Sequence, residues 1–316
     1  MLYRWTILLA IIFGICQPTQ ADSTFTLEFH QNGMKVSINN RLIMEYVWPD
    51  INVTRPYFKQ LKTLDGIQVT RNYPTDPVAD KDNDDHSTYH PGVWMAFGDV
   101  SGHDYWRNKV KIRHGGLMHI NPEGGFLTRK IFESKDGKDF FQEDCQYTIS
   151  IEKHGYILHT QSTFLSKTND FAFGDQEEMG FGVRLATGLR VSGGNGTMRN
   201  SEGGVNEKGT WGKKAGWLAG YGTVNSKGVG MMVIAHPDNF RKSWFHSRDY
   251  GLIVANPFGK KAMTGPNDDT VKNNSTRVKK GEEFELGFGL YVFSYDTNKE
   301  PDLAGMYQEY REYIKR

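Results

Sequence analysis

The chain of 316 residues contains only two cysteines, Cys16 and Cys145. Cys16 lies in the apolar N-terminal stretch, so a chain processed after Ala21 would keep one thiol and could not form an internal disulfide. Cys145 begins an alternating apolar run that extends to Ile151, which predicts a small core side chain rather than a nucleophile. The folded protein must therefore depend on burial of apolar surface, for which a chain of this length is ample.

The sequence also lacks an excess of charge of either sign. Lys and Arg number 38 and Asp and Glu number 37, which gives a formal net charge of +1. A general nucleic-acid binder needs a basic field, so this balance argues against nucleic acid as a partner. Neither Gly-x-x-x-x-Gly-Lys-Ser/Thr nor Gly-x-Ser-x-Gly occurs, which argues against a P-loop and weakens a serine-hydrolase interpretation.

Long apolar runs are absent beyond the N-terminal segment. There, Arg4 is followed by an apolar stretch from Trp5 to Cys16, and small residues precede Ala21. This arrangement predicts a secretory signal at residues 1–21, because the stretch is shorter than the roughly 20 residues that a membrane span needs. We expect an exported protein, periplasmic or secreted, with no membrane span in the mature chain and a single β-sandwich catalytic domain over residues 22–316.

Short alternating runs dominate the rest of the chain. Phe25, Leu27 and Phe29 alternate before Asn32-Gly33, a second run follows, and Asn39-Asn40 precedes a third, which predicts an N-terminal meander. Similar alternation occurs at residues 147–151, 156–160 and 284–292, whereas residues 302–314 have helical spacing. The pattern favours an all-β fold, a large antiparallel β-sandwich of jelly-roll or supersandwich type, with a short C-terminal helix.

The segment from His236 to Gly259 is rich in side chains that bind anions or transfer protons. A plain strand would alternate apolar and polar residues, and a surface loop would carry Lys, Glu and Ser instead. Planar donors, imidazoles and a phenol at this density predict a site for a polar, anionic ligand, although a buried hydrogen-bond network would collect the same residue types. The candidates are His236, Asn239, Arg241, His246, Arg248, Asp249, Tyr250 and Asn256.

A second cluster lies upstream and supplies His86, Tyr89, His90, Trp94 and Trp106. His86 and His90 have the spacing of helical zinc ligands, but no Glu follows His86 and the neighbouring Pro-Gly predicts a loop. We therefore expect no cofactor. The alternative is a divalent metal at His86 and His90, in place of imidazoles that transfer protons or hold a carboxylate.

Smaller groups complete the set of candidate residues. His119 ends an expected strand at residues 115–119, and Glu178 with Arg184 could form a pair, which is usually only a salt bridge. Indoles set among glycines either stack on sugar rings or pack at the edge of a core. This last group comprises Trp211, Lys213 and Trp217.

These clusters resemble the PmoA-like domain family of exported bacterial β-proteins. The resemblance rests on Asp85-His86 with His90, Gly92 and Trp94, on Gly98-Asp99-Val100 with Trp106, on Glu178 to Arg184, on Trp211-Gly212-Lys213 with Trp217, on His236 to Asn239 and on Trp244 to Gly259. The family pattern has a His and an Arg where this chain has Tyr89 and Pro91. That departure leaves open a different acid or base in this chain.

The resemblance implies an enzyme of polysaccharide breakdown, similar to an ulvan-oligosaccharide dehydratase. Such an enzyme removes water from a terminal uronic acid by β-elimination and leaves a 4,5-unsaturated sugar. The reaction needs donors that neutralise the carboxylate, a base for the C5 proton and an acid for the departing 4-oxygen. The candidate carboxylate binders are Arg184, Arg241 and Arg248, the candidate bases are His86, His119 and His246, and the candidate acids are Tyr89 and Tyr250.

Two other functions stay open at this point. A glycoside hydrolase would need two well-placed carboxylates, for which Asp99, Glu178, Asp238 and Asp249 are candidates. A non-catalytic carbohydrate-binding protein would use the aromatic and Arg side chains only to hold the glycan. The expected partner is an acidic oligosaccharide in the enzymatic interpretations, and the sequence does not determine the oligomeric state.

Overall fold

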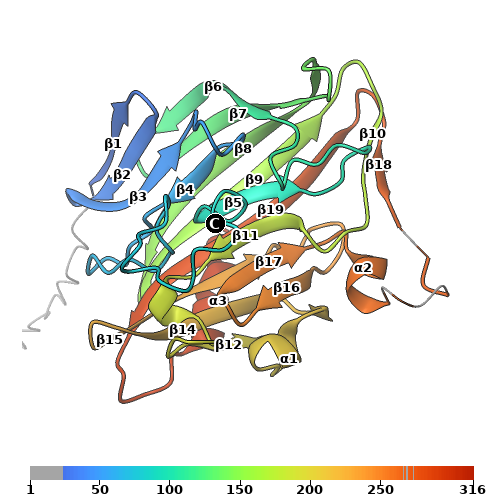
Figure 1. Ribbon diagram of the computed structural model, residues 1–316. Coiled ribbons are helices and arrows are strands. Elements are labelled where there is room, and N and C mark those ends of the chain that lie inside the picture. Colours follow the sequence, from blue (N-terminus) through green and yellow to red (C-terminus); the bar gives the residue numbers. More distant parts are fainter. Residues whose placement is uncertain (1–23, 266, 268–269, 273) are drawn as a thin grey trace, which may run out of the picture.

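The computed structural model describes residues 24–265, 267, 270–272 and 274–316, which form two large antiparallel sheets in layers (Figure 1). The expected signal segment, residues 1–21, lies outside the described residues. In order across the first sheet, the nine strands are β1 (Phe25–His30), β2 (Gly33–Ile38), β3 (Arg41–Val47), β4 (Tyr57–Lys59), β5 (Val93–Phe97), β11 (Met179–Arg184), β17 (Leu252–Asn256), β16 (Trp244–Arg248) and β13 (Lys213–Lys214).

The second sheet has eight strands. In order across the sheet they are β12 (Thr197–Asn200), β14 (Trp217–Val224), β15 (Lys227–Ala235), β19 (Glu283–Tyr295), β9 (Gly155–Leu165), β8 (Asp139–Glu152), β7 (Gly125–Glu133) and β6 (Ile112–Asn121). A small two-stranded sheet pairs β10 (Phe171–Phe173) with β18 (Thr276–Val278). The short helical elements are η1 (Thr187–Leu189), α1 (Asn206–Thr210), α2 (Lys260–Thr264) and α3 (Leu303–Tyr313).

This architecture confirms the predicted all-β antiparallel sandwich with a short C-terminal helix. Helix α3 occupies most of the expected 302–314 segment, and Asp302 caps its start by accepting a hydrogen bond from the amide of Gly305. The apolar face of α3 packs on the outer face of the eight-stranded sheet, where Met306 and Tyr310 join the cluster that contains Trp217. The helix therefore covers one outer face of the sandwich and leaves the other to loops.

The N-terminal meander forms as predicted from its turns. Asn39 and Asn40 have φ values of 51° and 61°, the left-handed pair that a tight hairpin turn requires. One detail differs from the alternation in the sequence: the register shifts between Val36 and Ser37. Because of this bulge, Ile43 is fully buried whereas Leu42 is only half-buried.

The main core lies between the two sheets. Because side chains alternate along a strand, Met95, Phe181, Ala255 and Phe245 form one row across β5, β11, β17 and β16 that faces this core. Cys145 lies in the same core as a free, fully buried thiol, as its alternating run predicted. Burial raises the pKa of Cys145 to about 11, so it stays a thiol in neutral solution.

The opposite face of the nine-stranded sheet is different in character. Trp94, Gly182, Val254 and His246 form its corresponding row, in which polar and aromatic side chains interrupt the aliphatic ones. Connections before and after β5 cover part of this face, and Trp106 packs there with Trp94 and Val254. This loop-covered face brings together residues from both clusters that the sequence singled out.

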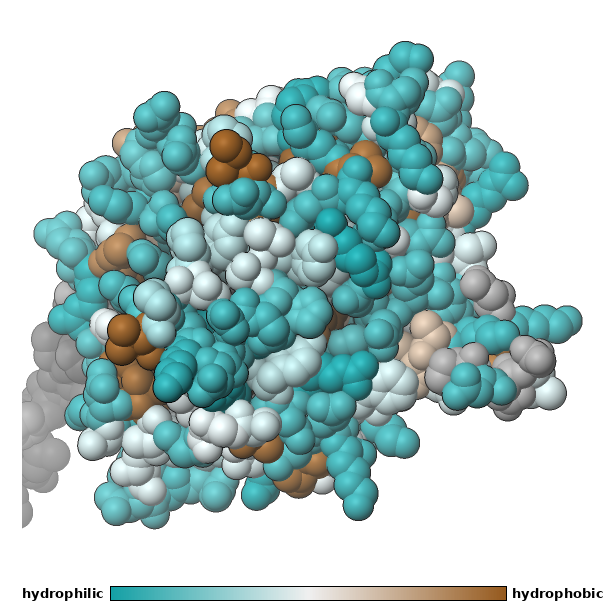
Figure 2. Space-filling view, in the orientation of Figure 1, coloured by the Kyte–Doolittle hydropathy of each residue, from teal (hydrophilic) through white to brown (hydrophobic). Residues whose placement is uncertain are grey.

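The surface seen in Figure 2 is mostly hydrophilic, with small separate hydrophobic areas. The exposed large apolar side chains of the described residues are spread along the chain, from Phe29 on β1 to Phe240 before β16. Single exposed apolar residues are common on protein surfaces and do not indicate a partner. Among the residues that the structure describes, no helix is both long and apolar enough to cross a membrane.

Candidate functional site

His86 lies in a tight turn on the connection that precedes β5. The amides of Tyr89 and His90 donate to the His86 carbonyl at 3.0 and 2.9 Å. His86 has a φ of 50°, in the left-handed region that few non-glycine residues adopt and that is often found at functional sites. Its side chain is 51% exposed, so the imidazole is accessible from solvent.

Asp85 accepts hydrogen bonds from two cationic or potentially cationic side chains. Its Oδ2 lies 2.7 Å from Nδ1 of His86, and its Oδ1 lies 2.6 Å from Nη2 of Arg184. Partial burial acts to raise the pKa of Asp85, but the hydrogen bonds from Arg184 and His86 outweigh it and hold the pKa below its ordinary value. An ionised carboxylate can only accept, so Nδ1 of His86 carries the proton of this hydrogen bond, and in the neutral imidazole Nε2 is the nitrogen with the lone pair.

Guanidinium groups hold the segment that carries this pair. Arg71 donates to the carbonyls of Asn83, Asp85 and His90 at 2.7 to 3.1 Å. Burial lowers the pKa of Arg71 to about 10, and the acceptor oxygens compensate its loss of hydration. Further donors to this segment are Arg55 to the Tyr89 carbonyl, Arg184 to the Asn83 side chain and Arg190 to the Asp82 carbonyl. The backbone around His86 is therefore fixed before any ligand arrives.

Three residues that were predicted to contact substrate are buried beneath His86 and are not exposed to solvent. His90 stacks on Trp94 with ring centroids 5.2 Å apart, and Trp106 meets both rings edge-on. The exposed fractions are 2% for His90 and Trp94 and 0% for Trp106. Trp94 lies directly over Gly182, where a Cβ would come within 2.8 Å of two indole carbons. The expectation that His90, Trp94 and Trp106 touch substrate is corrected: in this structure they support His86.

The geometry does not favour the metal alternative at His86 and His90. The two imidazoles are stacked, with centroids 5.4 Å apart and planes 25° apart, so their in-plane lone pairs do not converge on one ion. Burial, followed by the charge of Arg184, lowers the pKa of His90 well below its ordinary value. Among the described residues, no group of three or more His, Cys, Asp or Glu side chains could hold a metal ion.

Tyr250 reaches His86 from the hairpin between β16 and β17. Its ring lies nearly parallel to the His86 imidazole, with centroids 6.4 Å apart, and the Arg184 guanidinium lies 4.3 Å from the Tyr250 ring centroid. Burial raises the pKa of Tyr250, an effect that Arg184 opposes and Asp85 reinforces. The phenol thus stays protonated and can donate. The Tyr89 ring is tilted by 46° to the His86 ring, with centroids 6.2 Å apart.

Arg248 belongs to the same sheet face as Arg184. Both lie opposite Leu252, on the two strands that flank β17. Two strand spacings therefore separate their Cα atoms, which is about 10 Å. Arg248 donates to Glu207 at 2.9 Å and to Glu177 at 3.4 Å. Its guanidinium also lies 5.4 Å from the Trp211 ring centroid, and its side chain is 29% exposed. Of the predicted carboxylate binders, Arg248 is the one that combines partial exposure with an influence on Tyr250, the ring that lies parallel to His86.

His246 lies further along the same face but is not an accessible base. Its Nδ1 is 3.6 Å from Oε2 of Glu177, and only 3% of the residue is exposed. Burial, with a smaller contribution from the charge of Arg248, lowers its pKa to about 3. His246 is therefore neutral and buried, and its Nδ1 has no hydrogen-bond partner among the described residues.

Asp249 and Asn256 position neighbouring acidic residues. Asp249 accepts from the Glu207 amide at 2.8 Å, and its own amide donates to the Glu207 carboxylate at 3.0 Å. The Asn256 side chain donates to the carbonyls of Gln176 and Glu177 at 2.7 and 3.1 Å. Both residues are hydrogen-bonded to the protein itself, so the expectation that they bind substrate directly is replaced by a positioning role for Glu177 and Glu207.

Several predicted site residues lie elsewhere because their strands belong to the other sheet. His119 is exposed on β6, an edge strand of the eight-stranded sheet. Trp217 is buried under α3. The ring centroid of His236 lies 5.7 Å from that of His159 on the same outer face of the eight-stranded sheet. Asn239 exchanges hydrogen bonds with the backbone of Gly287 on β19 at 2.8 Å. The structure does not bring these four side chains to His86.

Three others stay near the nine-stranded sheet without joining the His86 group. Glu178 forms an ion pair with Arg107. Lys213 is exposed and lies opposite Phe245 in the strand register, so its side chain is on the sheet face of Phe245 and not on the face that carries Arg248. Arg241 lies against the rings of Phe240 and Trp244 at the far end of β16. These placements correct the expected roles of Glu178, Lys213 and Arg241 as substrate contacts.

We call the group that remains the His86 site. It consists of Asp85, His86, Tyr250, Arg248, Glu177, Glu207 and Trp211. Sequence reasoning missed Glu177 and Glu207 as site residues. The Asp85-His86 adjacency was visible, but adjacency in an irregular loop does not show which carboxylate meets which ring. The sequence does not show which of Glu177 and Glu178 faces the site. Both precede β11, which begins at Met179, so the alternation of side chains along a strand does not apply to them.

No curated protein matches this sequence. Among solved structures, the chain is similar to a GalM/aldose epimerase homologue from C. elegans, with 8% identity, a TM-score of 0.37 and coverage of 87% of this chain and 100% of that one. It is also similar to the GH36 alpha-galactosidase AgaA from Geobacillus stearothermophilus, with 11% identity, a TM-score of 0.38 and coverage of 87% and 40%.

A polysaccharide lyase is similar as well, with 11% identity, a TM-score of 0.32 and coverage of 88% of this chain and 33% of that one. The chain thus spans less than half the length of the galactosidase and of the lyase. Over residues 33–305 the sequence matches a family of unknown function, DUF6807. The chain belongs to this family.

Proposed function

We propose that this protein is an exported carbohydrate-active enzyme of the lyase type, a dehydratase that acts on a terminal uronic acid of an acidic oligosaccharide. The observation that carries the proposal is the Asp85–His86 pair, in which a carboxylate fixes the tautomer of an exposed imidazole. A protonated phenol, that of Tyr250, lies beside the same ring. An exposed base next to a protonated acid is the arrangement that β-elimination needs.

The proposed step assigns one role to each group. Nε2 of His86 takes the C5 proton, the C5–H electrons form the C4=C5 bond, and the C4–O bond breaks. Tyr250 gives its proton to the departing oxygen, which leaves as water, and proton exchange with solvent then restores both side chains. Asp85 stabilises the imidazolium formed on His86, as a buried carboxylate does for a catalytic histidine.

Recognition of the uronate carboxylate falls to Arg248. Nη1 and Nη2 of Arg184 are already hydrogen-bonded to Asp85 and Asn83, and its side chain is fully buried, so a ligand cannot approach it. Arg248 also donates to Glu207 and Glu177, but it is partly exposed, so a ligand carboxylate can reach its remaining N–H groups. Glu177 and Glu207 beside it can accept from sugar hydroxyls. Trp211, next to Arg248, adds an apolar surface for a sugar ring. The resemblance to an ulvan-oligosaccharide dehydratase supports the same substrate class.

Hydrolysis is less well supported by this geometry. A glycosidase needs one carboxyl group in surroundings that favour its protonated form, opposite a second, ionised one. At the His86 site, Glu177 and Glu207 both lie on the same cation, Arg248. Of the carboxylates expected to serve a hydrolase, Glu178 is paired with Arg107 and Asp249 with the Glu207 amide.

The proposal is tested by incubating purified protein with a panel of uronate-containing oligosaccharides, including sulfated algal ones, with and without a chelator. Elimination produces a conjugated double bond that absorbs in the ultraviolet and a product lighter by one water. New reducing ends without that absorbance would replace elimination by hydrolysis. Binding without any product would leave a carbohydrate-binding protein as the explanation, and loss of activity with chelator would contradict the metal-free step.

A further inference from the structure

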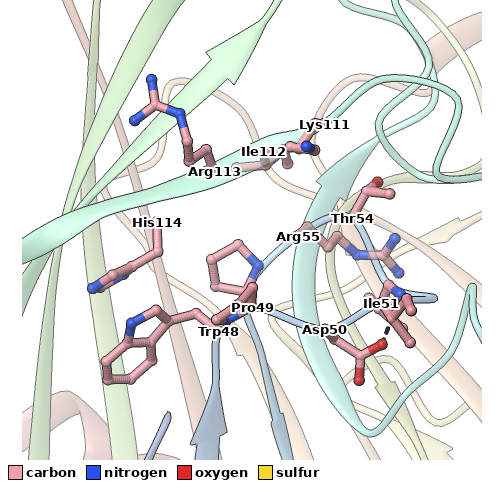
Figure 3. Close-up of a pocket in the computed structure, with 12 residues that line it drawn as sticks. Trp48, Pro49, Asp50, Ile51, Thr54, Arg55, Lys111, Ile112, Arg113 and His114 are labelled. Carbon is pink, nitrogen blue, oxygen red and sulfur yellow. Dashed lines mark hydrogen bonds between the residues drawn. The ribbon is translucent and has the colours of Figure 1, made fainter. Parts of the chain in front are cut away.

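A cavity separate from the His86 site lies between the β3–β4 connection and the start of β6 (Figure 3). Its volume is about 520 Å³, within the roughly 300–1,000 Å³ of typical small-molecule sites. No residue of the His86 site is among its described lining residues. The apolar part of the lining comes from Trp48, Pro49, Ile51, Val53, Pro56 and Ile112.

Most polar side chains around this cavity are already engaged by the protein. The Asp50 carboxylate accepts from the Tyr57 hydroxyl at 2.8 Å and from two backbone amides. Arg55 donates to the backbone carbonyls of Trp106 and Tyr89, and Arg113 pairs with two carboxylates. Lys111 is the exception among the charged side chains: within the described part of the chain, its ammonium has no hydrogen-bond or ion-pair partner. Nδ1 of His114, which also lines the cavity, has no hydrogen-bond partner among the described residues either.

His114 closes one end of the cavity without adding charge. Its imidazole lies on Trp48, with ring centroids 4.2 Å apart and planes 31° apart. Burial, followed by the charge of Lys130, lowers the pKa of His114 to about 4, so the ring is neutral in neutral solution. The cavity therefore has apolar and aromatic walls and a single unpaired cation at its rim.

We propose that this cavity binds a small ring-containing carboxylate, with the ring between Trp48, Pro49 and Ile112 and the carboxylate at Lys111. The apolar walls match a ring, and one unpaired cation matches one anionic group. A sugar fits less well, because most of its several hydroxyls would lose water against apolar walls that offer few free polar partners. This site and its ligand class are independent of the activity proposed for the His86 site.

Titration calorimetry with trans-cinnamate tests this proposal, and neutral cinnamamide serves as the matched ligand without charge. We expect saturable binding of cinnamate at one site per chain. In Lys111→Met the affinity should fall about tenfold, the size of one charge-assisted hydrogen bond, while the weaker binding of cinnamamide stays unchanged. Lys111 is exposed, so its replacement should leave the fold intact, which circular dichroism checks.

Two further variants decide between this cavity and binding elsewhere. Ile51, which lines the cavity, is 95% exposed, so Ile51→Asp adds a repelling charge without removing core packing and should also weaken cinnamate binding. Lys135→Met, an exposed lysine in the β7–β8 turn, should bind as the unmodified chain does. No saturable binding, equal affinity for acid and amide, or equal losses in Lys111→Met and Lys135→Met would each overturn the proposal.

Discussion

At the scale of single residues, His86 carries the proposed chemistry with little involvement in the fold. Its side chain is half exposed, and its hydrogen bond within the protein goes to the adjacent Asp85. We expect His86→Gln to keep the thermal stability of the protein while lowering kcat by about 10²–10⁴, the usual contribution of a general base. Initial rates of ultraviolet absorbance, measured beside melting curves, check both parts.

His119→Gln provides the matched control for that variant. His119 is also an exposed histidine, but it lies on an edge strand of the other sheet. Its replacement should leave both rate and stability unchanged. Equal activity of His86→Gln and the unmodified chain would remove His86 from the mechanism, and equal losses in both variants would show that the effect is not specific to the site.

At the scale of elements, the connection before β5 has no regular structure of its own around His86, so its shape depends on the arginines that it meets. Arg71 is fully buried and donates to three carbonyls of this connection. Replacing it by Met would leave those acceptors buried and unpaired, at a cost of about 3 kcal/mol or more. We expect Arg71→Met to lower both stability and kcat, and to increase amide exchange at residues 83–90.

Arg190 offers a milder comparison on the same connection. It is only partly buried, and its main contact there is with the Asp82 carbonyl. Arg190→Met should therefore cost less stability and leave amide exchange near His86 almost unchanged. If Arg71→Met and Arg190→Met had the same effect on exchange and rate, the preorganisation of the connection by Arg71 would be contradicted.

The elements also show what sequence patterns can and cannot predict. Alternation and Asn-rich turns are local, so the meander, β8, β9, β19 and α3 follow directly from the sequence. Which sheet a strand joins is a non-local property. His236 and His246 are close in sequence, yet β15 and β16 belong to different sheets, and His236 ends on the α3 side. Trp217 is separated from Trp211 in the same way, because Trp217 begins a strand of the eight-stranded sheet. The contact of Arg248 with Glu177 depends on where a loop lies, which the alternation of residues does not predict.

At the scale of the whole molecule, buried histidines link stability to pH. Burial lowers the pKa of His246 to about 3 and those of His114 and His159 to about 4. In the unfolded chain these imidazoles take up protons near pH 6.5, whereas the folded state resists protonation until its own lower pKa values. The contribution of these neutral histidines to stability should therefore be fully present above about pH 6.5 and should be lost as the pH falls toward 3–4.

Melting temperatures measured from pH 7.5 to pH 4 check this expectation. We expect a fall on the order of 10 °C, since each kcal/mol lowers the melting temperature of a large domain by roughly 2–4 °C. His246→Gln removes one of the linked groups, so its melting temperature should depend less steeply on pH even if it is lower throughout. A melting temperature that is constant or rises on acidification would contradict the assignment of these histidines as neutral and buried.

An ion pair between Lys130 on β7 and Glu143 on β8 lies in the core between the two sheets. Nζ of Lys130 lies 2.9 Å from Oε1 of Glu143, and their side chains are 5% and 0% exposed. Burial acts to lower the pKa of Lys130, but the charge of Glu143 outweighs it and the pKa is raised, so the ammonium persists. Ser162 donates to the same carboxylate oxygen at 2.7 Å, which completes a polar group inside an otherwise apolar core.

Such a pair stabilises a fold mainly while both partners remain. Lys130→Met would leave the Glu143 carboxylate buried without a cation, and we expect a loss of about 3–5 kcal/mol in the free energy of unfolding. The double variant Lys130→Met/Glu143→Leu removes both charges and should recover most of that loss, because apolar replacements of a buried pair are often neutral or stabilising. Urea denaturation of the single and double variants measures this difference. A double variant as unstable as the single one would show that the loss comes from disrupted packing between the sheets and not from the unpaired carboxylate.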